Sequence, residues 1–327
     1  MKKLLCIYCL LCMTALACAQ NLKFNANGKF KIVQFTDVHY IFNDPRAEVA
    51  IERINEVLNA ENPDLVMFTG DVIYGKPAEK SMRTVLEQVS KRKIPFAVTF
   101  GNHDDEQGLS RERLFEIIEN IPYSLTATTK GISGTTNFIL PVKSSDGQKD
   151  AEIIYVFDSH SYSQIKEVGG YDYIDFDQIQ WYREHSSQYT QANGGTPVPS
   201  LAFFHIPLPE YNQAATYENA ALFGIRKEKA CAPALNSGLF TAMKEMGDIK
   251  GVFVGHDHDN DYAVMWQGIL LAYGRYTGGN TVYNNLPNGA RIIELTEGEK
   301  GFRTWIRTKN HTEQEVIFPE SFLKPNK

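Results

Sequence analysis

The sequence has few cysteines, and nearly all of them lie at its N-terminal end. Four of the five fall within the first nineteen residues, at Cys6, Cys9, Cys12 and Cys18. If the chain is cleaved after that segment, only Cys231 remains and no intramolecular disulfide can form. No catalytic pattern surrounds Cys231, so we expect it to be a small buried apolar residue.

Long runs of basic residues are also missing. The chain has 33 lysines and arginines against 39 aspartates and glutamates, which gives a formal net charge of −6. Removal of the first nineteen residues would take away two lysines and no acidic residue, and so make the charge more negative. An acidic chain without a basic tract binds nucleic-acid backbones poorly, so we expect no nucleic-acid partner.

Residues 1–19 resemble a secretory signal peptide. Two lysines precede an apolar run over residues 4–16, and the small residues Ala17 and Ala19 follow. The run is too short to be read as a spanning helix. We therefore expect an exported protein, periplasmic or extracellular, without a transmembrane span.

Cys18 allows an alternative to cleavage after Ala19. Residues 15–18 read Ala-Leu-Ala-Cys, which resembles a bacterial lipobox in which Ala15 replaces a larger apolar residue. A lipid anchor at Cys18 would make the chain a membrane-anchored lipoprotein. Because the match is imperfect, we favour plain secretion.

After the leader, no internal repeat, low-complexity tract or linker divides the chain. Its 327 residues, 43% of them hydrophobic, suffice for one large α/β domain or two small ones. Because nothing separates two halves, we predict a single domain over residues 20–327.

Five apolar runs predict buried strands, over residues 31–36, 65–68, 94–100, 200–204 and 249–254. Apolar residues at helical spacing over residues 46–58 and 80–89 separate the first three runs. Strands and helices in alternation imply parallel pairing with right-handed crossovers. Two further runs, over residues 138–142 and 153–158, are joined by a polar turn and predict antiparallel strands as well.

Residues of types that commonly bind metals follow each of the five buried runs. They are Asp37 and His39, Asp71, Asn102 and His103, His205, and His256 and His258. Open α/β folds bind ligands at the carboxyl ends of their strands, so we expect these side chains to converge around Asp71. One such residue alone would more often be a turn cap or a buried histidine. Five of the eight histidines occupy these positions, however, which makes chance placement implausible.

The residue types at these strand ends favour a pair of metal ions. Carboxylates and imidazoles together suit Mn, Fe or Zn rather than calcium or magnesium. Two ions ~3.5–4 Å apart that share a bridging carboxylate would use nearly the whole set, and such pairs hydrolyse phosphate esters. The leaving alkoxide then needs a proton, and His103 is the candidate donor because it adjoins a ligand without being needed as one.

Five motifs in this order resemble the calcineurin-like metallophosphoesterase superfamily: Asp-x-His, Gly-Asp, Gly-Asn-His-Asp, a single His after a strand, and Gly-His-x-His. Residues 35–39, 101–106 and 255–262, continued by 273–275, are most similar to its purple-acid-phosphatase-like branch. The resemblance covers nearly all of the chain after the leader. It implies a four-layer α/β/β/α sandwich of two mixed β-sheets flanked by helices, with the metals at the sheet rims.

The resemblance also assigns roles to the strand-end residues. It implies that one metal is held by Asp37, His39, Asp71 and His258. It implies that the other is held by Asp71, Asn102, His205 and His256. His103 would be the general acid or would stabilise the leaving group, and Asn102 and His103 would also contact the substrate.

Asp104, Arg275 and Tyr74 are further candidates for the site. Asp104 either orients His103 or caps the next turn. Arg275 follows a strand and is a candidate for binding the substrate phosphate. Tyr74 completes a Gly-Asp-x-x-Tyr signature of true purple acid phosphatases, whose tyrosine ligates ferric iron. Those enzymes lack a histidine at the position of His39, so we expect Tyr74 to pack beside the centre instead.

Together these features predict an exported phosphoesterase with a dinuclear metal centre. It would hydrolyse phosphomonoesters with a metal-activated hydroxide, and its substrate would be a small phosphoester or a phosphoprotein. One alternative is a phosphodiesterase that acts on cyclic nucleotides or lipid head groups. Another is a catalytically silent binding protein that kept the fold, although such a protein has no need of the full ligand set.

Overall fold

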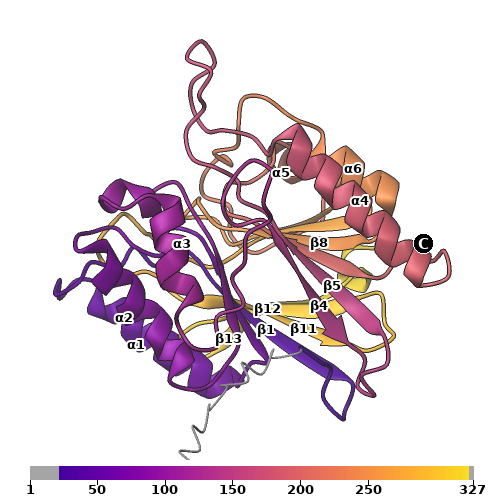
Figure 1. Ribbon diagram of the computed structural model, residues 1–327, viewed down its shortest axis with the longest axis horizontal. Helices are drawn as coiled ribbons and strands as arrows, with labels where there is room; N and C mark the ends of the chain where they lie inside the picture. The colour runs from indigo at the N-terminus through magenta and orange to yellow at the C-terminus, as the bar shows by residue number, and fades with distance from the viewer. Residues whose placement is uncertain (1–21, 324–327) are drawn as a thin grey trace, which may run out of the picture.

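Two mixed β-sheets lie face to face between two layers of helices (Figure 1). The computed structural model describes residues 22–323. The predicted signal peptide, its cleavage after Ala19 and the alternative lipid anchor at Cys18 lie outside the described residues. The arrangement of the two sheets and their helices confirms the predicted α/β/β/α sandwich.

The first sheet has the strand order β13-β12-β11-β1-β2-β3. Its strands are β1 (Lys29–Phe35), β2 (Leu65–Thr69), β3 (Phe96–Thr99), β11 (Ala290–Thr296), β12 (Phe302–Arg307) and β13 (Thr312–Phe318). β1, β2 and β3 are parallel, as the alternation of strands and helices predicts. β11, β12 and β13 each pair antiparallel with their neighbours.

Three helices cover the outer face of the first sheet: α1 (Glu48–Glu61), α2 (Ala78–Ser90) and α3 (Arg111–Glu119) (Figure 1). Ile54 of α1 and Val85 of α2 belong to the same buried cluster as Val33 of β1 and Val66 of β2. The apolar stripe of each helix is thereby removed from water, which stabilises the fold by ~1.5–3 kcal/mol for each large side chain.

The second sheet has the strand order β4-β5-β6-β8-β10-β9-β7. Its strands are β4 (Phe138–Lys143), β5 (Asp150–Val156), β6 (Ser200–Phe203), β7 (Leu222–Phe223), β8 (Ile249–Val254), β9 (Ala263–Trp266) and β10 (Ile269–Tyr273). β5, β6, β8 and β10 run parallel, and β4 pairs with β5 as the predicted antiparallel hairpin. The outer face carries α4 (Phe176–Ala192), α5 (Glu210–Thr216) and α6 (Leu239–Met246).

The inner faces of the two sheets meet in a third apolar cluster. Ile32 and Met67 of the first sheet lie there with Ile154 and Phe203 of the second. The central strands are therefore buried on both faces, one against helices and one against the other sheet. This is why they read as continuous apolar runs rather than as alternating ones.

Some elements differ from the sequence predictions. The strand predicted over residues 94–100 is shorter, since β3 spans only Phe96–Thr99. The helix α6 begins at Leu239, directly after Gly238, which takes a left-handed conformation (φ 87°). The short helix α5 and the edge strand β13 were not predicted, since neither carries a sustained apolar pattern. Among residues 22–323, no helix has the length and apolar character needed to cross a lipid bilayer.

Candidate metal centre

The residues predicted to bind metal lie directly after buried strands, and four of them have left-handed backbone conformations. Positive φ angles occur at Asp37 (52°), His39 (46°), Asp71 (50°) and His256 (82°). Residues other than glycine rarely adopt this region, and such positions gather at functional sites. The loops after β2 and β3 also pack closely, because a side chain in place of Gly101 would collide with the carboxylate of Asp71.

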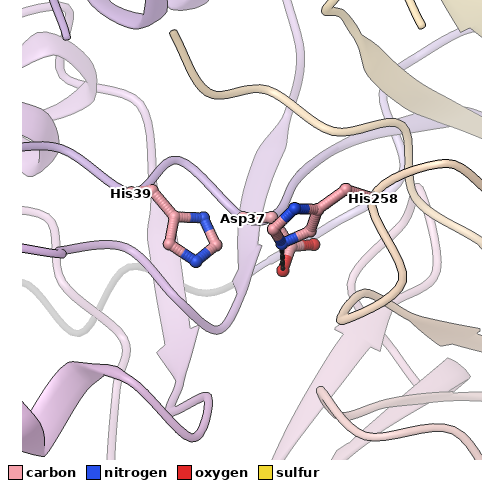
Figure 2. Close-up of side chains that lie close together, drawn as sticks. All are labelled: Asp37, His39 and His258. Atoms are coloured by element: carbon pink, nitrogen blue, oxygen red, sulfur yellow. Dashed lines mark ion pairs between the residues drawn. The ribbon is translucent and has the colours of Figure 1, made fainter. Parts of the chain in front are cut away.

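One group of ligand-type side chains joins the first and second sheets. The ligand atoms of Asp37, His39 and His258 lie within 4.8 Å of one another (Figure 2). His258 Nε2 is 3.7 Å from Asp37 Oδ1. His258 Nδ1 donates to the carbonyl of Tyr283 at 2.9 Å, and because a carbonyl only accepts, Nε2 keeps its lone pair for a ligand.

A second group has the same construction. The ligand atoms of Asp71, His205 and His256 also lie within 4.8 Å of one another. His205 Nδ1 donates to the carbonyl of Thr69 at 2.8 Å, which leaves Nε2, 3.2 Å from Asp71 Oδ2, as the ring nitrogen available to a ligand. His256 Nδ1 lies 3.3 Å from that same nitrogen. Two imidazoles and a carboxylate therefore face one point.

Asp71 belongs to the second group and also faces the first. Its Oδ2 atom is 3.4 Å from His39 Nε2 and 3.2 Å from His205 Nε2. Its Oδ1 atom accepts a hydrogen bond from the backbone of His103 at 2.8 Å, which fixes the carboxylate in place. The side chain is buried, with 1% of its residue surface exposed. This is the position that a carboxylate shared by two ions requires.

Several buried polar atoms at this centre have no hydrogen-bond partner among residues 22–323. They are both ring nitrogens of His39, Asn102 Oδ1 and His256 Nε2. A buried polar atom left unpaired costs about 1–3 kcal/mol, so a site built this way calls for a ligand. Nitrogen and carboxylate donors in this number fit two first-row transition metal ions.

The protonation of these groups supports the same fit. Burial would raise the pKa of Asp71, but the charges of His205 and His39 hold it well below its usual range. Burial alone would lower the pKa of His205, but the charge of Asp71 raises it, to about 9. Burial, together with the charge of His205, lowers the pKa of His256 well below its usual value. A protonated His205 therefore offsets the negative charge of Asp71, which is the charge that a bound cation would balance instead.

Asp104 does not orient His103. Its fully buried carboxylate accepts backbone hydrogen bonds from Gly101 (2.8 Å), Asp71 (3.0 Å), Val72 (2.8 Å) and Ile73 (3.1 Å). Burial and the charge of Asp71 raise its pKa to about 6. The prediction of a catalytic Asp104 is therefore corrected: it ties the loop after β3 to the loop that carries Asp71.

Arg275 is also assigned differently by the structure. Its guanidinium is completely buried. Nε donates to Asp261 at 2.7 Å, and Nη1 donates to the carbonyl of Pro287 at 2.7 Å. Nη2 pairs with Glu313. All three nitrogens of the group donate to protein. The prediction that Arg275 binds the substrate phosphate is wrong, because the guanidinium is buried and its charge is already paired with two carboxylates.

Tyr74 packs beside the centre. Its ring lies edge-on to His39, with ring centroids 5.2 Å apart, and edge-on to His103, with centroids 5.1 Å apart. Both contacts are those of an aromatic packing residue.

Replacement of Tyr74 tests this packing role. We expect Tyr74→Phe to keep both metals and to change turnover less than about threefold, since the ring contacts remain and each pair contributes only ~0.5–1.5 kcal/mol. The iron-loaded wild-type protein should show no visible charge-transfer band. A coloured wild-type protein that Tyr74→Phe bleaches would make Tyr74 a ligand.

Sequence reasoning missed three residues at the centre and misjudged one elsewhere. Glu106 contacts His103, and Tyr162 and Tyr171 reach the centre from the segment between β5 and α4. Glu106 stands three residues after His103, which is a usable signal, whereas nothing local marks the two tyrosines. Cys231 is exposed rather than buried, so that prediction was wrong.

Comparisons with known sequences point to one family. The profile of the calcineurin-like phosphoesterase family matches residues 30–260. The chain is 32% identical over 290 residues to an Arabidopsis thaliana protein named "Probable inactive purple acid phosphatase 14", covering 78% of this chain and 72% of that one. It is 34% identical over 347 residues to "Phosphatase DCR2" of Saccharomyces cerevisiae, covering 94% of this chain and 58% of the yeast protein.

Solved structures share the fold at low sequence identity. A dimetal phosphatase from Danio rerio superposes with a TM-score of 0.61 at 12% identity, over 88% of this chain and 98% of that one. The purple acid phosphatase PPD1 from yellow lupin (Lupinus luteus) gives a TM-score of 0.52 at 11% identity, over 88% of this chain and 53% of that one. At these identities the likeness concerns the fold alone.

Proposed function

Because the chain belongs to the calcineurin-like phosphoesterase family, we propose that it is a phosphomonoesterase with a dinuclear metal centre. One ion would be held by Asp37, His39, Asp71 and His258, and the other by Asp71, Asn102, His205 and His256. The observation that carries the proposal is the place of Asp71, whose Oδ2 atom lies within 3.4 Å of histidines from both groups. The ions would be Mn, Fe or Zn, in keeping with mixed nitrogen and oxygen donors.

The side chains around the ions would divide the work of ester hydrolysis. Two bound cations would offset the charge of the phosphate and make water a better nucleophile. Asn102 and His103 would contact the substrate, and His103 would give the leaving oxygen its proton. His103 suits that role because its side chain is 28% exposed, whereas His39 and His205, which follow β1 and β6, are fully buried.

Three relatives that are named probable inactive purple acid phosphatases favour a second candidate, a binding protein without catalysis. Against it stands the complete set of ligand-type residues at the strand ends, together with the partly exposed His103. We further propose that the protein is exported and that its substrate is a small phosphoester or a phosphoprotein. The export proposal rests on residues 1–19, and the lipid anchor at Cys18 is its variant.

A comparison of two nitrophenyl substrates tests the proposal. The purified chain should be stripped with a chelator and reloaded with two equivalents of Mn, Zn or Fe. We expect it to hydrolyse p-nitrophenyl phosphate at least ~10-fold faster than bis-p-nitrophenyl phosphate, and to lose this activity on chelation because the cations carry the charge stabilisation.

The other outcomes of that comparison select the rival functions. Faster turnover of the diester would make the protein a phosphodiesterase. Two bound equivalents of metal without turnover of either ester would make it a binding protein. Turnover that survives complete removal of metal would contradict the dinuclear mechanism itself.

A further inference from the structure

The segment between β5 and α4 projects from the body of the molecule as a narrow loop (Figure 1). An antiparallel bridge between Tyr162 and Tyr171 closes its base. Backbone hydrogen bonds from Ser163 to Gly170 (2.9 Å) and from Asp172 to Ser161 (3.0 Å) flank that bridge. We call residues 159–174 the Tyr162 hairpin. Its stem is thus a defined structure rather than a loose connection.

The base of the Tyr162 hairpin rests on the metal centre. The ring of Tyr171 packs against the ring of His256, with centroids 4.3 Å apart and planes at 89°. The ring of Tyr162 stacks on Tyr171 with centroids 5.7 Å apart. Ser161 Oγ donates to the carbonyl of Asn102 at 3.3 Å. A hairpin that leaves the second sheet is therefore fixed beside a loop of the first sheet.

Glu106 connects this hairpin with His103. One carboxylate oxygen of Glu106 lies 2.6 Å from His103 Nδ1, and the other accepts from the hydroxyl of Tyr162 at 3.1 Å. A carboxylate in its ionised form only accepts hydrogen bonds, so His103 Nδ1 carries the hydrogen. The other ring nitrogen, Nε2, is then the one left to face a substrate. To protonate a leaving oxygen, His103 gives up the proton on Nε2 of the doubly protonated ring and keeps the one on Nδ1. Asp104, whose oxygens are taken by backbone amides, cannot compete for this place.

We propose that Glu106 is the positioning residue of His103 and that Tyr162 holds Glu106 in place. The Tyr162 hairpin thereby orients the proton donor that stands on the other sheet. This inference rests on the proposed function, because His103 is there the group that protonates the leaving oxygen. It adds a chain of contacts, from Tyr162 through Glu106 to His103, that decides which ring nitrogen reaches the substrate.

Leaving-group dependence separates positioning from a merely structural role. Partners that orient a site histidine are typically worth ~10–100-fold, so we expect Glu106→Ala to lower kcat by that factor on alkyl phosphates, whose leaving groups need a proton. On p-nitrophenyl phosphate the loss should stay below about threefold, with unchanged metal content. Glu106→Gln should recover most of the loss, because its amide oxygen also accepts from Nδ1. Tyr162→Phe should fall between wild type and Glu106→Ala.

Two controls keep the proposal falsifiable. Glu167→Ala removes an exposed carboxylate from the tip of the same hairpin and should change nothing. In the His103→Ala background, Glu106→Ala should cost nothing further, since the two residues act as one unit. Losses that multiply in the double variant, or an equal loss on good and poor leaving groups, would overturn the proposal.

A readout without turnover separates this inference from the proposed function. Nitrogen-15 NMR of the zinc-loaded protein should show His103 protonated at Nδ1 in the wild type and in Glu106→Gln, but exchanging between tautomers in Glu106→Ala. That result together with no ester hydrolysis would reject the function and keep the positioning. His103 protonated only at Nε2 in the wild type would reject the positioning whatever the activity.

Discussion

Asp71→Asn is expected to disturb both metal sites at once and to lower turnover on the order of 10³-fold or more. The amide keeps the shape of the carboxylate but removes the charge that faces His39 on one side and His205 on the other. A bound metal ion supplies several kcal/mol of charge stabilisation, and each 1.4 kcal/mol is a factor of ten in rate. Metal content by mass spectrometry and turnover of p-nitrophenyl phosphate measure both effects.

His39→Ala is the matched comparison for Asp71→Asn. His39 shares a group with Asp37 and His258, whereas His205 and His256 share theirs with Asp71. We therefore expect His39→Ala to release one equivalent of metal and to keep the other. Retention of one full equivalent by Asp71→Asn would show that Asp71 serves a single ion, and the shared-carboxylate arrangement would have to be given up.

Asp104→Asn is expected to destabilise the fold by ~3 kcal/mol or more. Four backbone amides donate to this one buried carboxylate. An asparagine would turn its own amide donors toward two of these groups, and each buried amide left without an acceptor costs about 1–3 kcal/mol. Against a typical free energy of unfolding of about 5–15 kcal/mol, the loss is large. Urea unfolding of the metal-free protein measures it without interference from metal binding.

Asp105→Asn is the control for that experiment. Asp105 is the next residue, but its side chain is 34% exposed and lies 3.6 Å from Arg111. Partly exposed ion pairs of this kind contribute about 0–1 kcal/mol, so we expect little change in the urea midpoint. Equal midpoints for Asp104→Asn and the wild type would mean that the loops after β2 and β3 do not depend on this carboxylate.

Much of the fold was readable from the sequence because it depends on local patterns. Apolar runs that end in polar residues gave the central strands, and the helices between them gave parallel pairing. The resemblance to known phosphoesterases supplied the two mixed sheets, which no periodicity could distinguish from one sheet. The edge strand β13 was not predicted, since its buried side chains are mainly Val316 and Phe318 at one end.

The ligand-type residues were also readable, because each follows a strand and the parallel strands of each sheet end at the same edge. Arg275 shows the limit of that reasoning. It too follows a strand, yet its side chain forms ion pairs with Asp261, from the loop before β9, and with Glu313 of β13. A position after a strand tells where a side chain starts and not which partner it finds.

By itself, the sequence determined which residues stand at the strand ends and what chemistry their side chains can perform. Only the tertiary structure decided that Asp104 serves the backbone of Asp71, while Glu106, from the same turn, reaches His103. It also brought Tyr162 to Glu106 from the other sheet, at 3.1 Å. The physical reason is that periodicity records how one element meets its neighbours, whereas hydrogen-bond partners depend on how two whole sheets pack.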